Sequence, residues 1–328
     1  MGLKPTTLDE QLEILKHRNI ILPYKSDMIL LQYGYYNLVN GYKNPFIDTI
    51  KSSALGEDYY KDGTSLDHLV ELYKFDSILR QNLLYCIVTV ETQMKSLISL
   101  YFSNRFGSSH WDYLNPKSFT KDPSKKKFVN SLITKLQRDI SKFQTKKRHP
   151  AICHFIETYN QVPLWVLNTI MDFGTMSKFY DNLSDDMKKS IAKSINSNLT
   201  PKVLSSILYY LTDIRNKCAH NNRLYIHKID QRASRVSMIP QLSIHKEMQI
   251  PYNAETKQYQ YGQDDILAAA LCLSMFFDQT RIFGVNYEAI EKSLQKLEEN
   301  IPDDAAAFVR EVTGLSEKFL QKLYEIFE

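Results

Sequence analysis

LTDIRNKCAHNNRLY, residues 211–225, completes the most regular helical pattern in the chain. Thr200 and Pro201 precede the pattern as an N-cap and a first helical residue, and Asn221–Asn222 follow it as a polar stop. Apolar residues recur at helical spacing on one face, at Val203, Leu204, Ile207, Leu208, Leu211, Ile214 and Cys218. A helix from Pro201 to about His220 with one buried face is therefore predicted.

Three polar side chains near the end of this helix suit chemistry on a phosphodiester. Histidine moves protons near neutral pH, and a guanidinium group stabilises charge on phosphorus. At about 100° per residue, Asn216 and His220 share a face with Tyr209 and Asp213, and Arg215 lies at the edge of the apolar face. The amide of Asn216 is placed to orient either partner by hydrogen bonding.

The spacing between the arginine and the histidine is by itself weak evidence for a catalytic site. Arg105 and His110 repeat it at a Gly-Ser helix exit, where no site is expected. A structural explanation also stays open, in which His220 favours a helix C-terminus as a cation and Arg215 extends its stem from the core edge.

Several sequence blocks give the helix a family context. They are KPTTLDEQLEILKHRNIIL (4–22), LLQYGYYNLVNGYKNPF (30–46), LYKFDSILRQNLLYCIVTVETQMKSLIS (72–99), VPLWVLNTIMDFGTMSKFYDNL (162–183) and LTDIRNKCAHNNRLY itself. In order and spacing they resemble the Abi-like (AbiD/AbiF) abortive-infection family of bacterial phage defence. The last block resembles the signature of HEPN-domain ribonucleases. The resemblance extends from Lys4 to Tyr225, about two-thirds of the chain.

The resemblance implies an all-α fold, a HEPN-type helical bundle with N-terminal and C-terminal helical extensions. It also implies a metal-independent endoribonuclease toxin, with Arg215 and His220 as catalytic residues and Asn216 as their orienter. The 2′-hydroxyl would attack the phosphate and leave a 2′,3′-cyclic phosphate, with no cofactor and no metal. One motif per chain implies a homodimer. A small non-coding RNA or an antitoxin is a further expected partner.

Two positions depart from the family pattern. HEPN toxins silenced by adenylylation carry a tyrosine two residues after the histidine, where this chain has Asn222; its nearest tyrosine is Tyr225. Lys95 stands where the family helix often has arginine. Glu91 and Lys95, four residues apart, form either a pair that orders the site or an ordinary solvated helix pair.

An RNA enzyme must also hold the backbone of its substrate. Five basic residues directly follow the motif and are the predicted RNA-binding residues: Arg223, His227, Lys228, Arg232 and Arg235. Two further basic clusters, 125–127 and 146–148, flank one predicted helix. Each cluster has the alternative explanation of ordinary solvated charge.

Two other functions stay open beside the nuclease. A non-catalytic RNA-binding or partner-binding HEPN module would use the same basic surface and keep Arg215 and His220 for structure. A third and weaker hypothesis is a toxin that acts on a protein. The chain has no HExxH and no phosphate-binding glycine loop, which disfavours a zinc or nucleotide enzyme.

Composition sets broad limits. The 328 residues are 43% hydrophobic with a net charge of +4, which suits a sizeable core and permits RNA binding. The four scattered cysteines suggest buried thiols in a reducing compartment. No basic-then-apolar signal peptide opens the chain, and Glu91 and Lys95 interrupt its most apolar run, so we expect a cytoplasmic protein whose apolar run is a buried helix.

Four segments are predicted: an N-terminal helical element (1–64), a HEPN core (65–225), an irregular linker or insertion (226–263) and a C-terminal helical segment (264–328). Helices are expected over 7–19, 27–39, 65–105, 125–148, 151–159, 164–172, 175–183 and 185–195. A loop is expected over 52–64, and a small hairpin around Asn253–Ala254.

Overall fold

The computed structural model describes residues 6–145, 149–229, 238–276, 281–315, 321–323 and 325–326, without the side chains of 281–283. These residues form thirteen helices of seven or more residues and one two-stranded hairpin. The all-α class predicted from the sequence is confirmed.

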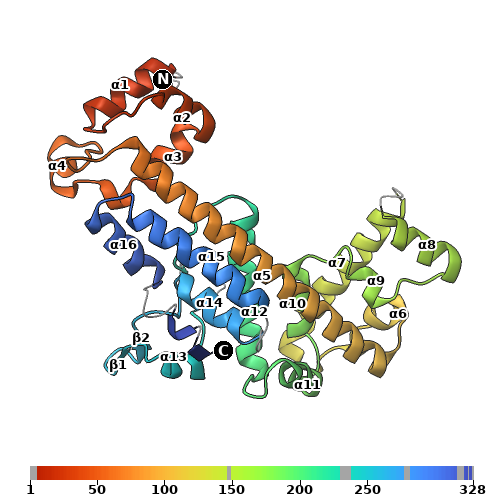
Figure 1. Cartoon of the computed structure of the whole chain (residues 1–328). Coiled ribbons are helices and arrows are strands. Elements are labelled where there is room, and N and C mark those ends of the chain that lie inside the picture. Colours follow the sequence, from red (N-terminus) through yellow and green to blue (C-terminus); the bar gives the residue numbers. More distant parts are fainter. Residues whose placement is uncertain are drawn as a thin grey trace.

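The longest helix, α5 (Leu66–Phe106), organises the molecule. It contains 41 residues, and the other helices gather along it (Figure 1). At 1.5 Å per residue it is about 60 Å long. The expected Ser65 cap is present, since the Ser65 side chain accepts a hydrogen bond from the backbone amide of Asp67.

Short helices occupy the N-terminal end of α5. They are α1 (Leu8–His17), α2 (Ser26–Tyr33), α3 (Tyr35–Tyr42) and α4 (Thr49–Leu55), with a 3-10 turn at Asn44–Phe46.

Two predictions for this end were wrong. The single helix expected over 27–39 is broken into α2 and α3 at Gly34, whose φ of 76° lies in a region that side-chain-bearing residues rarely adopt. The loop expected over 52–64 begins later than predicted. Asp48 starts α4 by accepting the backbone amides of Ile50 and Lys51.

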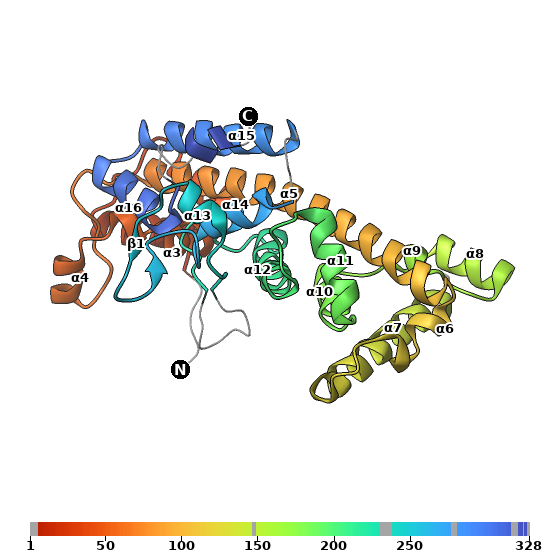
Figure 2. The same cartoon turned by 90° about the horizontal axis from the view of Figure 1, so that it is seen from below.

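The other end of α5 carries a second lobe, and α7 projects from it (Figure 2). Its elements are α6 (His110–Tyr113), the 3-10 turns Pro116–Ser118 and Pro123–Lys125, α7 (Lys126–Thr145), α8 (Pro150–Tyr159) and α9 (Leu164–Leu167). Helices α10 (Phe173–Asp181) and α11 (Asp185–Ile195) lead to α12 (Pro201–Ala219). The helix predicted over 164–172 ends at Leu167, because Asp172 instead caps α10 and accepts the amide of Thr175 at 2.7 Å.

The C-terminal part returns to α5. It comprises α13 (Ser243–Glu247), β1 (Tyr252–Asn253), β2 (Gln258–Tyr259), α14 (Ile266–Ser274), α15 (Arg281–Glu298) and α16 (Asp303–Thr313). The predicted hairpin is confirmed, with Tyr252 opposite Tyr259, whereas the short helix α13 was not predicted. Helix α15 lies alongside α5 in both views (Figures 1 and 2).

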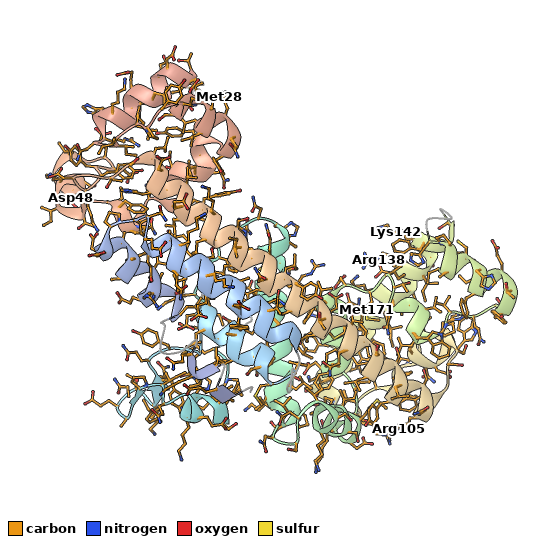
Figure 3. The ribbon with its side chains drawn as sticks, in the orientation of Figure 1. Met28, Asp48, Arg105, Arg138, Lys142 and Met171 are labelled. Atoms are coloured by element: carbon orange, nitrogen blue, oxygen red, sulfur yellow. The ribbon has the colours of Figure 1, made fainter. Side chains whose placement is uncertain are left out.

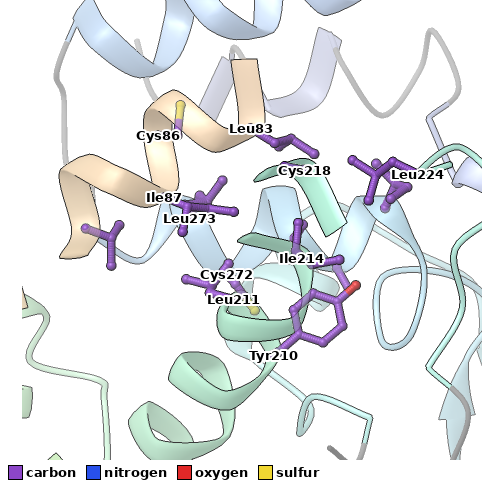
Figure 4. Close-up of a cluster of buried hydrophobic side chains, with 14 of the residues drawn as sticks. Leu83, Cys86, Ile87, Tyr210, Leu211, Ile214, Cys218, Leu224, Cys272 and Leu273 are labelled. Carbon is purple, nitrogen blue, oxygen red and sulfur yellow. The ribbon is translucent and has the colours of Figure 1, made fainter. Parts of the chain in front are cut away.

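Helices α5, α12 and α14 meet in the core. Leu83 and Ile87 of α5, Leu211 and Ile214 of α12 and Leu273 of α14 gather there, all fully or almost fully buried (Figure 4). Every residue of the predicted apolar stripe of α12 is buried except the partly buried Val203. The core therefore fixes which face of α12 points outward.

Burial also accounts for the cysteines. Cys86, Cys218 and Cys272 are buried and Cys153 is half-buried, all as free thiols. Burial raises the pKa of the Cys86 and Cys218 thiols to about 12, which makes them poor nucleophiles.

Helix α5 is also the one helix in the described residues that is long and apolar enough to cross a membrane by length and composition alone. Within the fold this helix supplies core positions along its length, from Leu66 to Phe102. The core helix of a protein without a membrane span passes the same test of length and composition.

Candidate functional site

The C-terminal end of α12 has a well-defined geometry. Asn221 adopts φ 55°, the left-handed conformation that ends many helices. The backbone amides of Asn221 and Asn222 donate to the carbonyls of Cys218 at 3.3 Å and Lys217 at 3.0 Å. This reverse turn closes the helix at His220, the C-cap residue, and confirms the polar stop predicted for Asn221–Asn222.

The three predicted catalytic residues lie on this last part of α12. Arg215 is half-buried, and its Nε atom is buried without a hydrogen-bond partner among the described residues. Asn216 and His220 are exposed, and neither side chain has a hydrogen bond within the part of the chain that the structure describes. A guanidinium, an amide and an imidazole thus stand at one helix end without internal partners in that part.

A buried polar cluster fixes the chain immediately after His220. The Asp76 carboxylate accepts the backbone amides of Leu224 at 3.0 Å and Tyr225 at 2.7 Å. It also accepts the Tyr42 hydroxyl at 2.8 Å and forms an ion pair with Arg80. We call Tyr42, Asp76 and Arg80, with these two amides, the Asp76 cluster.

Burying the two charges of the Asp76 cluster has a desolvation cost. Asp76 is 0% and Arg80 4% exposed, and burial raises the pKa of the Asp76 carboxyl. The guanidinium of Arg80 and the accepted hydrogen bonds act in the opposite direction and favour the ionised form. Several accepted hydrogen bonds and one ion pair offset the desolvation of the Asp76 carboxylate. Arg80 donates through Nη1 to Asp76 and Tyr42, whereas its Nη2 is buried without a partner among the described residues.

Two further contacts anchor the same segment. The Arg223 guanidinium donates to the carbonyls of Asn40 at 3.2 Å and Gly41 at 3.1 Å, at the end of α3. The Tyr225 ring stacks on Tyr42 with centroids 5.8 Å apart. The sequence blocks at 30–46, 72–99 and 211–225 therefore meet physically at the Asp76 cluster.

Sequence reasoning assigned no role to Asp76 or Arg80. The available signal was their spacing of four residues in the predicted helix, a spacing that permits an ion pair. Because Tyr225 is fully buried against Tyr42, its hydroxyl is also not exposed for modification. Asn222, which was compared from the sequence with the tyrosine of adenylylated HEPN toxins, is exposed.

On the outer face of α12, Asp213 contacts a histidine of the segment that follows the helix. His227 Nε2 lies 2.9 Å from Asp213 Oδ2, and this contact lowers the pKa of the Asp213 carboxyl. The His227 side chain is only 8% exposed. The structure thus places His227 beneath the surface, in contact with the Asp213 carboxylate, whereas it was predicted from the sequence to contact RNA.

The other predicted RNA-binding residues are placed differently from one another. Lys228 is exposed, and Arg223 is exposed apart from the guanidinium nitrogen that bonds the end of α3. Arg232 and Arg235 lie outside the described residues, as does the 146–148 cluster.

Glu91 and Lys95 form the predicted pair at 2.7 Å, with side chains 11% and 15% exposed. The pair is therefore not simply solvated. Lys95 also donates to the carbonyl of Met171, which lies beside α5 at the start of the link to α10 (Figure 3). A methyl group placed on Gly174 in the first turn of α10 would lie 3.5 Å from the Thr212 methyl carbon. The Met171–Gly174 segment thus connects this pair to α12, three residues before Arg215.

Among the residues that the structure describes, no group of three or more His, Cys, Asp or Glu side chains gathers as a metal site would.

Comparison with known proteins gives one finding. A family model described as Abi-like protein matches residues 28–226, a range that contains the Asp76 cluster and all of α12. No curated protein and no solved structure matches the chain.

Proposed function

The chain belongs to the Abi-like protein family, which is associated with abortive-infection defence against phage, and from this premise we propose that it is a HEPN-type endoribonuclease. One observation carries the proposal. Arg215, Asn216 and His220 lie on the last two turns of α12 with no side-chain partner among the described residues. The core and the Asp76 cluster hold the chain on both sides of them through buried contacts and hydrogen bonds.

The chemistry follows from these three side chains. His220 takes the proton of the ribose 2′-hydroxyl or gives one to the leaving 5′ oxygen. The 2′ oxygen forms a bond to phosphorus while the bond to the 5′ oxygen breaks, so the products are a 2′,3′-cyclic phosphate and a 5′-hydroxyl. Arg215 neutralises the extra charge on the pentavalent phosphorus, and Asn216 orients the phosphate or the imidazole.

We further propose that the active form is a homodimer, because one imidazole per chain supplies one proton carrier and the reaction uses two. The outward face of α5 supports this. Its exposed residues over five turns carry no charge: Gln81, Tyr85, Val88, Thr92, Ser96 and Leu100. Exposed helix faces are normally charged, and interface centres are depleted of charge.

The alternative is an RNA-binding module that does not cut. The half-buried position of Arg215 favours it, because such a stem also contributes packing. The nuclease needs the His220 imidazole for catalysis, whereas the binding module does not. The substitution His220→Ala therefore distinguishes the two functions.

The test is cleavage of labelled RNA in EDTA by wild type, His220→Ala and Arg215→Ala. His17→Ala is the matched control, since His17 is likewise an exposed histidine at a helix C-terminus. We expect wild type and the control to cut, and both site variants to lose at least about 100-fold in rate, as for other general acid–base and charge-stabilising groups. Undiminished cutting by folded His220→Ala would reject the assignment. Binding without cutting by any variant would favour the non-catalytic module.

A further inference from the structure

A hollow between α7, α10 and α12 lies outside the site described above. Its volume is about 700 Å³. The residues that matter for its chemistry are Lys125, Phe128, Lys135, Arg138, Lys178 and Tyr209. We call it the α7–α12 hollow.

The hollow has a positive lining. Four cations and one carboxylate, Asp181, line it. Lys125 pairs with Asp181, and Lys135 pairs with Asp139 at 2.8 Å and Asp172 at 3.2 Å.

Two of the cations stand apart from these pairs. Arg138 and Lys178 are exposed and have no ion-pair partner among the described residues (Figure 3 labels Arg138 on α7). They approach the hollow from two different helices, α7 and α10, as a phosphate-binding clamp requires. An arginine fork and a lysine ammonium are the two side chains that bind phosphate best.

Aromatic side chains complete the lining. Phe128 is 54% exposed on α7, and the half-buried Tyr209 enters from α12. An exposed phenyl ring offers a stacking surface to an unpaired base. Cations combined with aromatic rings are typical of sites that bind single-stranded nucleic acid, whose bases are free to stack.

Tyr209 also connects the hollow to the predicted catalytic end of α12. At 100° per residue, Tyr209, Asp213, Asn216 and His220 share one face of the helix. His220 follows Tyr209 by eleven residues, which is roughly 17 Å along the axis. At 3.4 Å per stacked nucleotide, that distance corresponds to about five nucleotides. The carboxylate on this path, Asp213, lies 2.9 Å from the His227 imidazole, and its side chain is 33% exposed.

We propose that the α7–α12 hollow binds single-stranded RNA a few nucleotides from the bond that is cut. The inference rests on the proposed nuclease function and names its substrate class. Arg138 and Lys178 bind consecutive phosphates, and Phe128 stacks on one base. The strand then follows the outer face of α12 to His220.

The test measures binding of a fluorescent twelve-nucleotide oligouridine to His220→Ala protein over a range of salt concentrations. The double variant Arg138→Glu/Lys178→Glu is compared with Lys246→Glu/Lys296→Glu, an equal charge change at exposed sites elsewhere. We expect the hollow variant to lose at least about tenfold in affinity and about 1.4 in the slope of log K against log salt, at 0.7 per phosphate contact for single strands. Phe128→Ala should weaken binding at least about fivefold with an unchanged slope.

Several outcomes would overturn the proposal. They are equal losses in the two double variants, no loss in either, no binding of oligouridine at all, or tighter binding of a duplex of the same length. Equal competition by polyglutamate would indicate an acidic protein partner instead. RNA binding in the α7–α12 hollow and the nuclease activity can each be rejected without the other. If the hollow variant binds and cuts like wild type, only the hollow is rejected. If RNA binds in the hollow but wild type never cuts, only the nuclease is rejected.

Discussion

The Asp76 cluster yields the sharpest prediction about this fold. In Asp76→Asn the side chain keeps its shape and one acceptor oxygen, but the fully buried charge of Arg80 loses its counter-ion. Removing one partner of a buried ion pair costs about 3–5 kcal/mol, because the remaining charge stays desolvated. Against a total stability of about 5–15 kcal/mol, this loss is large but leaves a folded protein to measure.

Removal of the other charge behaves differently. In Arg80→Met the Asp76 carboxyl, whose pKa burial already raises, escapes by taking up a proton. The loss should therefore be smaller at pH 5 than at pH 8. The double variant contains neither charge, so its loss should fall short of the sum of the single losses by at least about 2 kcal/mol.

The assay is urea unfolding followed by circular dichroism for the four proteins of this cycle. Amide hydrogen exchange on Asp76→Asn should also show that Leu224 and Tyr225 lose protection, since Asp76 accepts both amides. A loss below about 1 kcal/mol in Asp76→Asn, or strict additivity in the double variant, would refute the reasoning.

Three further predictions follow from burial and charge. Burial raises the pKa of Asp265 to about 6, so between pH 4 and pH 6 the folded protein holds a proton that the unfolded protein has released. Stability should therefore fall by about 2 kcal/mol from pH 4 to pH 6, and Asp265→Asn, which keeps a helix cap, should flatten that part of the urea-unfolding profile. Val88→Glu on the uncharged face of α5 should shift light-scattering mass toward the monomer, whereas Ile50→Glu, also exposed, should not; a dimer unaffected by both would place the interface elsewhere. With Ellman's reagent on native protein, half-buried Cys153 should react first and Cys218 only at the rate of unfolding; early loss of Cys218 would contradict its burial.

Local signals in the sequence were sufficient to predict the main helices. Thr200, Pro201 and the apolar spacing placed α12 and its buried face, and the Ser65 cap placed the start of α5. The same kind of signal failed at Gly34, where one positive φ outweighed an apolar pattern that continues across it. These elements depend on neighbours only a few residues away, which is why pattern reasoning reaches them.

The surroundings of the candidate site depend on long-range contacts. Tyr42 and Tyr225 reach Asp76 from positions 34 and 149 residues away, so no local pattern marks the three as one cluster. His227 was expected among surface cations, but its pairing with Asp213 appears only when the chain after α12 folds back on that helix. The α7–α12 hollow likewise combines residues from three helices.

The most direct test of the central claim uses a mapped cleavage site and two substrates. One is an RNA oligonucleotide, and the other is identical except for a single 2′-deoxynucleotide on the 5′ side of the cut. Wild type and His220→Ala are compared in EDTA. The account predicts that wild type cuts the RNA, leaves a 2′,3′-cyclic phosphate and spares the deoxy substrate, and that His220→Ala cuts neither. Cutting at the deoxy position, or equal cutting of RNA by both proteins, would contradict it.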